Sequence, residues 1–165
     1  MQKITPFLWF DNQAEEAMNF YVDVFKSSPK EDAKDSEIVH INRYPSGYTE
    51  GPMTDMEGKV LTGIFKLAGV GFMCLDGGKQ GWSFNESTSF YVECEDQAEI
   101  DYFYEKLSAV PESEICGWCK DKYGLSWQII PKTMEELISK NKAAMDAMLK
   151  MKKINIKELE AAANG

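Results

Sequence analysis

Hydrophobic and polar positions in the first part of the chain change from a strand-like to a helix-like pattern. Residues 4–10 form an apolar, aromatic run that ends at Asp11 and Asn12, which predicts a β-strand. Asn12 and Glu15 then have the spacing of a capping box, which predicts a helix start. The apolar positions that follow recur at steps of three and four, which is typical of one buried helix face: Ala14, Ala17, Met18, Tyr21 and Phe25.

Three further strands are expected before residue 77. Residues 37–44 alternate enough to predict a strand, and a loop rich in glycine and proline follows over residues 45–58. Residues 59–67 and 70–75 are strand-like and are separated only by Ala68 and Gly69, which predicts a hairpin. The first half of the chain therefore has the order βαβββ.

The same order begins again after the glycine-rich residues 76–81. Residues 87–93 predict a strand, and Asp96 with Glu99 predicts a second capped helix. Residues 115–120 and 125–131 predict two strands around a turn, and a further short strand is expected over 110–114, although it contains Pro111. The pattern is an internal repeat, so we expect an α+β fold of two βαβββ modules.

The β signals disappear beyond Met134, and apolar residues at helical spacing predict two or three short amphipathic helices. We expect one domain over residues 1–165, with a first module at about 3–76, a second at about 87–131 and a helical tail at about 133–165. The tail is apolar enough to need burial, either on its own domain or across a homodimer.

Composition restricts the classes of partner. The chain has 165 residues and a formal net charge of -9, which argues against nucleic acid, because phosphate binding needs clustered basic residues. An acidic substrate would be repelled at long range unless a local basic patch guides it. No apolar run has the length of a membrane span and no signal peptide is recognisable, so we expect no membrane partner and a cytoplasmic location.

The four cysteines are expected to be reduced. Cys116 and Cys119 have Cys-x-x-Cys spacing, but they straddle a predicted strand, in which positions three apart point to opposite faces. A zinc site would need a second pair, and Cys74 and Cys94 are isolated.

Three other candidate features favour structural roles. The glycine-rich residues 76–81 follow a predicted strand, but no helix follows them to bind a nucleotide or S-adenosylmethionine. His40 is the only histidine and has no evident partner. Asp121 begins a turn, where an aspartate usually accepts hydrogen bonds from its own backbone.

Several aromatic motifs resemble one known family. They are Phe7-Leu8-Trp9-Phe10-Asp11-Asn12-Gln13-Ala14-Glu15-Glu16-Ala17, Asn19-Phe20-Tyr21, Ser89-Phe90-Tyr91-Val92-Glu93-Cys94, Cys116-Gly117-Trp118 and Asp121-Lys122-Tyr123-Gly124-Leu125-Ser126-Trp127-Gln128-Ile129. Together they resemble the glyoxalase/bleomycin-resistance/dioxygenase (vicinal oxygen chelate) superfamily, in its PhnB-like branch named after 3-demethylubiquinone methyltransferases. The resemblance implies two βαβββ modules whose curved mixed sheets enclose a cavity, usually with dimerisation. It does not fix the activity.

The resemblance also implies where metal ligands would lie in metal-dependent relatives. One ligand comes from each of four strands, and these positions fall near Thr5 or Pro6, near Met73, near Thr88 and on Gln128. Such residues do not form a credible ligand set, because a catalytic divalent metal needs about three ligands from His, Asp, Glu or Cys. We therefore expect neither a metal nor another cofactor.

Aromatic residues concentrate around the expected cavity. We predict that a small molecule binds there to Trp9, Trp82, Tyr91, Trp118 and Gln128. Alternation in residues 125–130 places Gln128 and Trp127 on opposite faces, so we expect Trp127 on the helix-packed face.

The expected function is metal-independent binding or catalysis of an unidentified small molecule, and whether the protein is an enzyme stays open. The alternatives are a metal-dependent lyase, isomerase or dioxygenase of the glyoxalase type, and a non-catalytic structural or regulatory homodimer.

Overall fold

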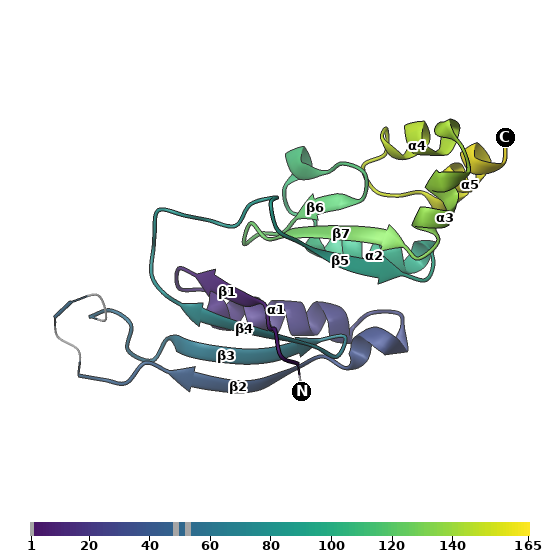
Figure 1. Cartoon of the computed structure of the whole chain (residues 1–165). Helices are drawn as coiled ribbons and strands as arrows, with labels where there is room; N and C mark the ends of the chain where they lie inside the picture. Colours follow the sequence, from purple (N-terminus) through teal and green to yellow (C-terminus); the bar gives the residue numbers. More distant parts are fainter. Residues whose placement is uncertain (1, 48–49, 52–53) are drawn as a thin grey trace. The chain divides into compact units, whose positions relative to one another are not determined.

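The computed structural model describes residues 2–47, 50–51 and 54–165. The chain divides into two compact units, Met1–Trp82 and Ser83–Gly165 (Figure 1). The first predicted module lies in the first unit, and the second module and the tail lie in the second. Four positions of the predicted loop over residues 45–58, namely 48–49 and 52–53, lie outside the described residues.

The first unit is a four-stranded mixed sheet with one long helix, and it has the predicted βαβββ order. Its strand order is β1-β4-β3-β2, in which β1 runs parallel to β4 and the other pairs are antiparallel. Its elements are β1 (Phe7–Phe10), α1 (Ala14–Lys26), a 3-10 helix η1 (Glu31–Lys34), β2 (Glu37–Arg43), β3 (Val60–Leu67) and β4 (Val70–Asp76).

The local sequence explains the hairpin and the helix packing. Ala68 and Gly69 both have positive φ, 47° and 76°, as a tight turn between twisted strands requires. Helix α1 packs on β3 so closely that a Cβ at Gly63 would lie 2.6 Å from the Met18 sulfur. A larger residue at position 63 would therefore force the fully buried side chains of Met18 and Cys74 to shift.

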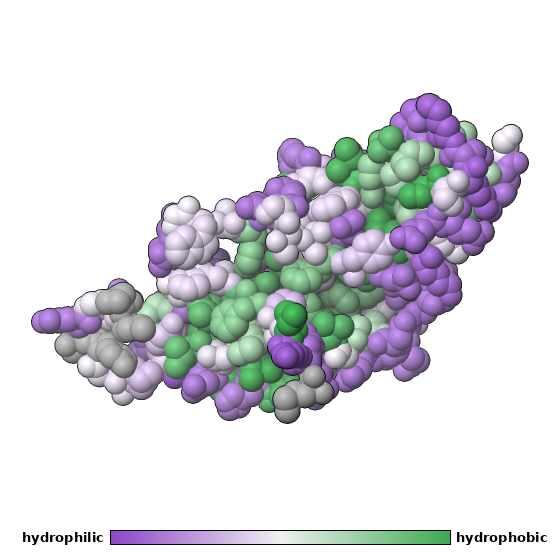
Figure 2. Space-filling model, in the orientation of Figure 1, coloured by the Kyte–Doolittle hydropathy of each residue, from purple (hydrophilic) through white to green (hydrophobic). Residues whose placement is uncertain are grey.

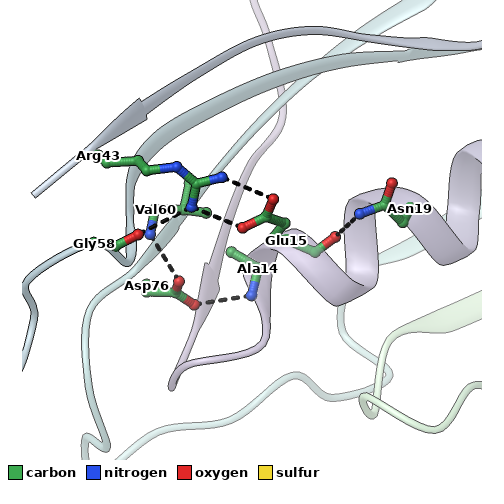
Figure 3. A network of polar contacts seen from close by, with 7 residues as sticks. All are labelled: Ala14, Glu15, Asn19, Arg43, Gly58, Val60 and Asp76. Carbon is green, nitrogen blue, oxygen red and sulfur yellow. Dashed lines mark hydrogen bonds and ion pairs between the residues drawn. The ribbon is translucent and has the colours of Figure 1, made fainter.

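The predicted capping box at the start of α1 is wrong. Asn12 does not cap the helix; instead Asp76, at the end of β4, accepts hydrogen bonds from the backbone N–H groups of Ala14 (2.8 Å) and Val60 (3.0 Å) (Figure 3). Glu15 accepts two 2.8 Å hydrogen bonds from the Arg43 guanidinium instead of turning back to the helix start. Partners distant in sequence replace the local ones.

The second unit is a three-stranded mixed sheet followed by a helical tail. Its strand order is β5-β7-β6, in which β5 runs parallel to β7 and β6 antiparallel to it. Its elements are β5 (Ser89–Cys94), α2 (Gln97–Leu107), a 3-10 helix η2 (Pro111–Ser113), β6 (Trp118–Lys120), β7 (Ser126–Pro131), α3 (Met134–Lys140), α4 (Lys142–Met148) and α5 (Ile156–Asn164).

Two predictions for this unit have different outcomes. The predicted cap of α2 is confirmed: Asp96 accepts a hydrogen bond from the Glu99 N–H (3.0 Å), while the Glu99 side chain accepts one from the preceding residue, the Glu95 N–H (2.7 Å). The strand expected over 110–114 is wrong, because η2 occupies this segment with Pro111 at its first position, where proline favours a helical turn. The second module therefore has the order βαββ, and the predicted α+β class holds for both modules.

The tail buries its apolar face within its own unit. Ile130 at the end of β7, Ile154 and Leu159 are fully or almost fully buried in one cluster with α3, α4 and α5. The tail backbone also accepts hydrogen bonds from the N–H groups of Cys116 (2.8 Å) and Gly117 (2.7 Å). Figure 2 shows hydrophobic side chains still exposed over α4 and α5, but most of the surface that suggested a dimer through the tail is covered here. No helix in the described part of the chain is long and apolar enough to cross a membrane.

Candidate functional site

Alternate side chains of strand β7 lie on opposite faces of the second sheet. Trp127 is only 1% exposed and lies on the face that α2 covers, whereas Gln128 is partly exposed on the opposite face. This is the arrangement expected from the alternation. We call the face that carries Gln128 the open face and the other the α2 face.

The α2 face is a packed core. The Trp127 ring lies 5.6 Å from that of Phe90, and its indole N–H donates a 2.8 Å hydrogen bond to Asp121. The other Asp121 oxygen accepts from the N–H groups of Tyr123 (2.9 Å) and Leu125 (3.0 Å). Asp121 is 1% exposed, so it holds the β6–β7 turn and the tryptophan in place.

An aromatic row crosses the open face. Tyr91 of β5 and Trp118 of β6 are both the register partners of Gln128, so the three side chains lie side by side. The Gln128 Nε2 donates a 2.8 Å hydrogen bond to the Ser89 hydroxyl. This bond orients the amide, and within the described residues its Oε1 has no partner. The structure thus brings together three of the five predicted site residues.

A polar row lies beside the aromatic row on the same face. Ser126 is the register partner of both Ser89 and Lys120. Its hydroxyl is buried, with the residue 1% exposed, and has no hydrogen-bond partner in the described structure. Lys120 forms an ion pair with Glu86, which holds the pKa of the Glu86 carboxyl below its usual value. Sequence reasoning missed this row, although the alternation that placed Gln128 also places Ser126.

The other two predicted site residues lie in the first unit. The rings of Trp9 and Trp82 meet edge to face with centroids 5.6 Å apart, and Trp82 is 62% exposed. The Trp9 indole donates a 3.2 Å hydrogen bond to the Gly78 carbonyl. A Cβ at Gly77 would lie 2.1 Å from the Trp9 ring, so glycine is needed there. These two residues form a pair of their own.

The predicted ligand positions do not fit a metal. In the first unit, Met73 donates its N–H to the Pro6 carbonyl (2.9 Å), so these two positions adjoin, but neither side chain is a ligand for a hard or borderline cation. In the second unit, Thr88 precedes β5 and the Gln128 amide donates to the Ser89 hydroxyl, so the side chains at and beside these positions are hydroxyls and an amide. Among the described residues no cluster of three His, Cys, Asp or Glu could hold a metal ion.

The cysteines and His40 lie in surroundings that favour a structural role. None of the four cysteines, all of which lie in the described residues, forms a disulfide; Cys119 is buried on the α2 face, where burial and the nearby Asp121 carboxylate raise the pKa of its thiol to about 12. Cys116 precedes β6 in a turn with φ of 51°. His40 is exposed in β2 opposite Ile64.

A hollow of about 770 Å³ lies among α4, α5 and the segment that joins them. Two of its charged side chains already have partners: Asp146 pairs with Lys142, and Lys153 with Asp101. The open face differs because it combines aromatic surface with a buried polar group that lacks a partner.

Comparison with known proteins agrees with this architecture. A putative 3-demethylubiquinone-9 3-methyltransferase, PhnB protein, from Bacillus cereus is 39% identical, with a TM-score of 0.60 over 78% of this chain and 99% of that chain. A protein from Pseudomonas aeruginosa, 15% identical, has a TM-score of 0.52 over 77% of this chain and 95% of its own, which shows a shared fold. No curated protein matches the chain.

The sequence matches the family described as 3-demethylubiquinone-9 3-methyltransferase over residues 2–130, which include both sheets almost completely. The matched segment ends at Ile130, so the α3–α5 tail lies beyond it. The chain belongs to this PhnB-like family, and its fold is the α+β fold of glyoxalase-like proteins.

Proposed function

We propose that the protein binds a small planar molecule on the open face of the second sheet, without a metal ion. One observation carries the proposal: Tyr91, Gln128 and Trp118 share one register row, and Gln128 presents an oriented amide between two aromatic side chains. Aromatic faces bind planar apolar groups, and a fixed amide selects their orientation. Tyr91 is 52% exposed, so its ring is accessible to a ligand.

Trp9 and Trp82, which lie in the first unit, are proposed as a separate ligand-contacting pair, as the sequence suggested. Trp82 exposes most of its surface while Trp9 is held by Gly78, so the pair combines one fixed and one accessible ring. Their contribution is testable by itself: Trp82→Ala should weaken binding without lowering stability, because an exposed side chain contributes little to the core.

Metal-dependent glyoxalase-type chemistry is the weaker alternative. The ligand positions hold no His, Asp, Glu or Cys, so their side chains do not fit a catalytic divalent metal. Methyl transfer also lacks support, because the segment after β4 leads through Trp82 to β5 without a helix whose N-terminus could face a cofactor. Elemental analysis of protein purified without chelator would contradict the proposal if it found one transition metal per chain.

Binding itself is tested by calorimetric titration of a panel of planar aromatic molecules into the full chain. Gln128→Ala should abolish or strongly weaken binding while leaving the free energy of unfolding nearly unchanged, because Gln128 is partly exposed. Thr88→Ala is the matched control, since Thr88 is exposed and precedes β5. Equal binding by the Gln128 variant and the wild type would refute the role of this row.

Homodimerisation stays a proposal as well. The exposed apolar side chains of the first unit, such as Phe7 (49% exposed) and Val70 (49% exposed), support it better than the tail does, because the tail buries most of its own apolar face. Light scattering at micromolar concentration should give twice the monomer mass, and a monomer would count against it.

A further inference from the structure

The polar row of Ser89, Ser126 and Lys120 can donate hydrogen bonds to a ligand. Ser126 Oγ is buried and unpartnered, and an unsatisfied buried hydroxyl lowers stability unless something else binds it. Ser89 accepts its hydrogen bond from Gln128, so its own proton is available to donate. Lys120 contributes an ammonium group in the same row. The row therefore gathers three hydrogen-bond donors.

Charge is distributed unevenly along the open face. At the polar row the less exposed partner of the ion pair is the cation: the Lys120 side chain is 20% exposed, whereas that of Glu86 is 57% exposed. At the far side of the aromatic row, burial and the nearby carboxylates of Glu93 and Glu135 raise the pKa of Tyr91. An anionic group is therefore favoured at Lys120 and repelled beyond Tyr91.

We infer that the open face binds aromatic carboxylic acids, with the carboxylate on the row of Ser89, Ser126 and Lys120 and the aromatic body against Trp118 and Tyr91. This rests on the proposed function and names its ligand class. The two rows are two residues apart along the strands, or about 6.6 Å. One or two carbon atoms between carboxylate and ring span this separation.

A carboxylate fits the row better than a dianionic group. Lys120 is the single cation of the row, Glu86 already offsets its charge, and the whole chain carries a formal net charge of -9. A second negative charge on the ligand would have no partner here. The Glu86 carboxylate then competes with the ligand for Lys120. The ligand either displaces Glu86 from Lys120 or binds Lys120 together with it.

The test compares acids with their uncharged amides. Phenylacetate and 3-phenylpropanoate, each with the corresponding amide, are titrated into the full chain by calorimetry. The acids should bind at least about tenfold more tightly than the amides, which are matched in shape. Lys120→Gln should abolish this preference, and Lys122→Gln, with the same change of net charge at an exposed neighbour, should retain it.

Glu86→Gln should strengthen the preference for acids that Lys120→Gln abolishes. Removing the competitor should tighten binding of the acids about threefold or more and leave the amides unchanged, whereas Glu112→Gln, an exposed control on η2, should have no effect. Thermal melting confirms that each variant is folded.

Equal affinity for acids and amides would overturn this inference and leave the proposed function intact. Failure of both members of every pair to bind would count against the proposed function itself, and against the inference with it.

Discussion

Replacing Trp127 with alanine tests whether the two faces of the second sheet are assigned correctly. Trp127 is 1% exposed, packs against Phe90 and donates a 2.8 Å hydrogen bond to Asp121. Deleting a buried tryptophan costs about 3–5 kcal/mol, and the loss should lie at the upper end because one Asp121 oxygen also loses its donor.

This loss is large compared with the stability of a typical protein. Whole-protein stabilities are about 5–15 kcal/mol, so Trp127→Ala removes a third or more of a typical value. At about 2–4 °C per kcal/mol for a chain of this size, the melting temperature should fall by about 6–20 °C. Urea denaturation followed by circular dichroism measures the change in free energy directly.

Trp118→Ala is the matched control. The two tryptophans lie on adjacent strands of one sheet, but Trp118 is partly exposed on the open face. Its replacement should cost clearly less than that of Trp127. The reasoning is refuted if Trp118→Ala destabilises the protein as much as Trp127→Ala does, because the register and every open-face residue would then be misassigned.

Three further predictions concern buried polar groups. Asp76→Ala should destabilise by about 2–4 kcal/mol in urea denaturation, because the N–H groups of Ala14 and Val60 lose their acceptor; a loss below about 1 kcal/mol would show that they have other partners. Ser126→Ala should raise stability by about 1 kcal/mol while weakening carboxylate binding, and a loss of stability instead would show that the hydroxyl already has a partner. Cys119, whose pKa is raised to about 12, should resist iodoacetamide at pH 8 until urea unfolds the chain, and rapid labelling of the native protein would contradict its burial.

The two helix starts show which features the sequence could predict. The cap of α2 forms as expected: Asp96 accepts a hydrogen bond from the Glu99 N–H, and the Glu99 side chain turns back to the helix start. The equivalent pair in α1 fails because Arg43 binds Glu15 and Asp76 binds Ala14, and neither partner is adjacent in sequence. Local patterns were therefore reliable only where tertiary partners did not compete.

The candidate site was predictable to a similar extent. Period-two alternation was enough to place Trp127 under α2 and Gln128 on the open face. It could not show that the Gln128 amide donates to the Ser89 hydroxyl, because pairing between strands depends on the fold. The polar row was missed for the same reason: Ser126 is an ordinary serine until its register beside Lys120 and its burial are known.

The binding face is tested most directly by the indole N–H signals of the tryptophans in a ¹H–¹⁵N spectrum during titration with 3-phenylpropanoate. Trp118 and Trp127 lie on opposite faces of one sheet, so each is a control for the other. The Trp118 indole and the Gln128 side-chain amide should shift together with one dissociation constant, while the Trp127 indole, bonded to Asp121, should stay in place. A shift of Trp127 without a shift of Trp118 would contradict the assignment of the open face as the binding surface.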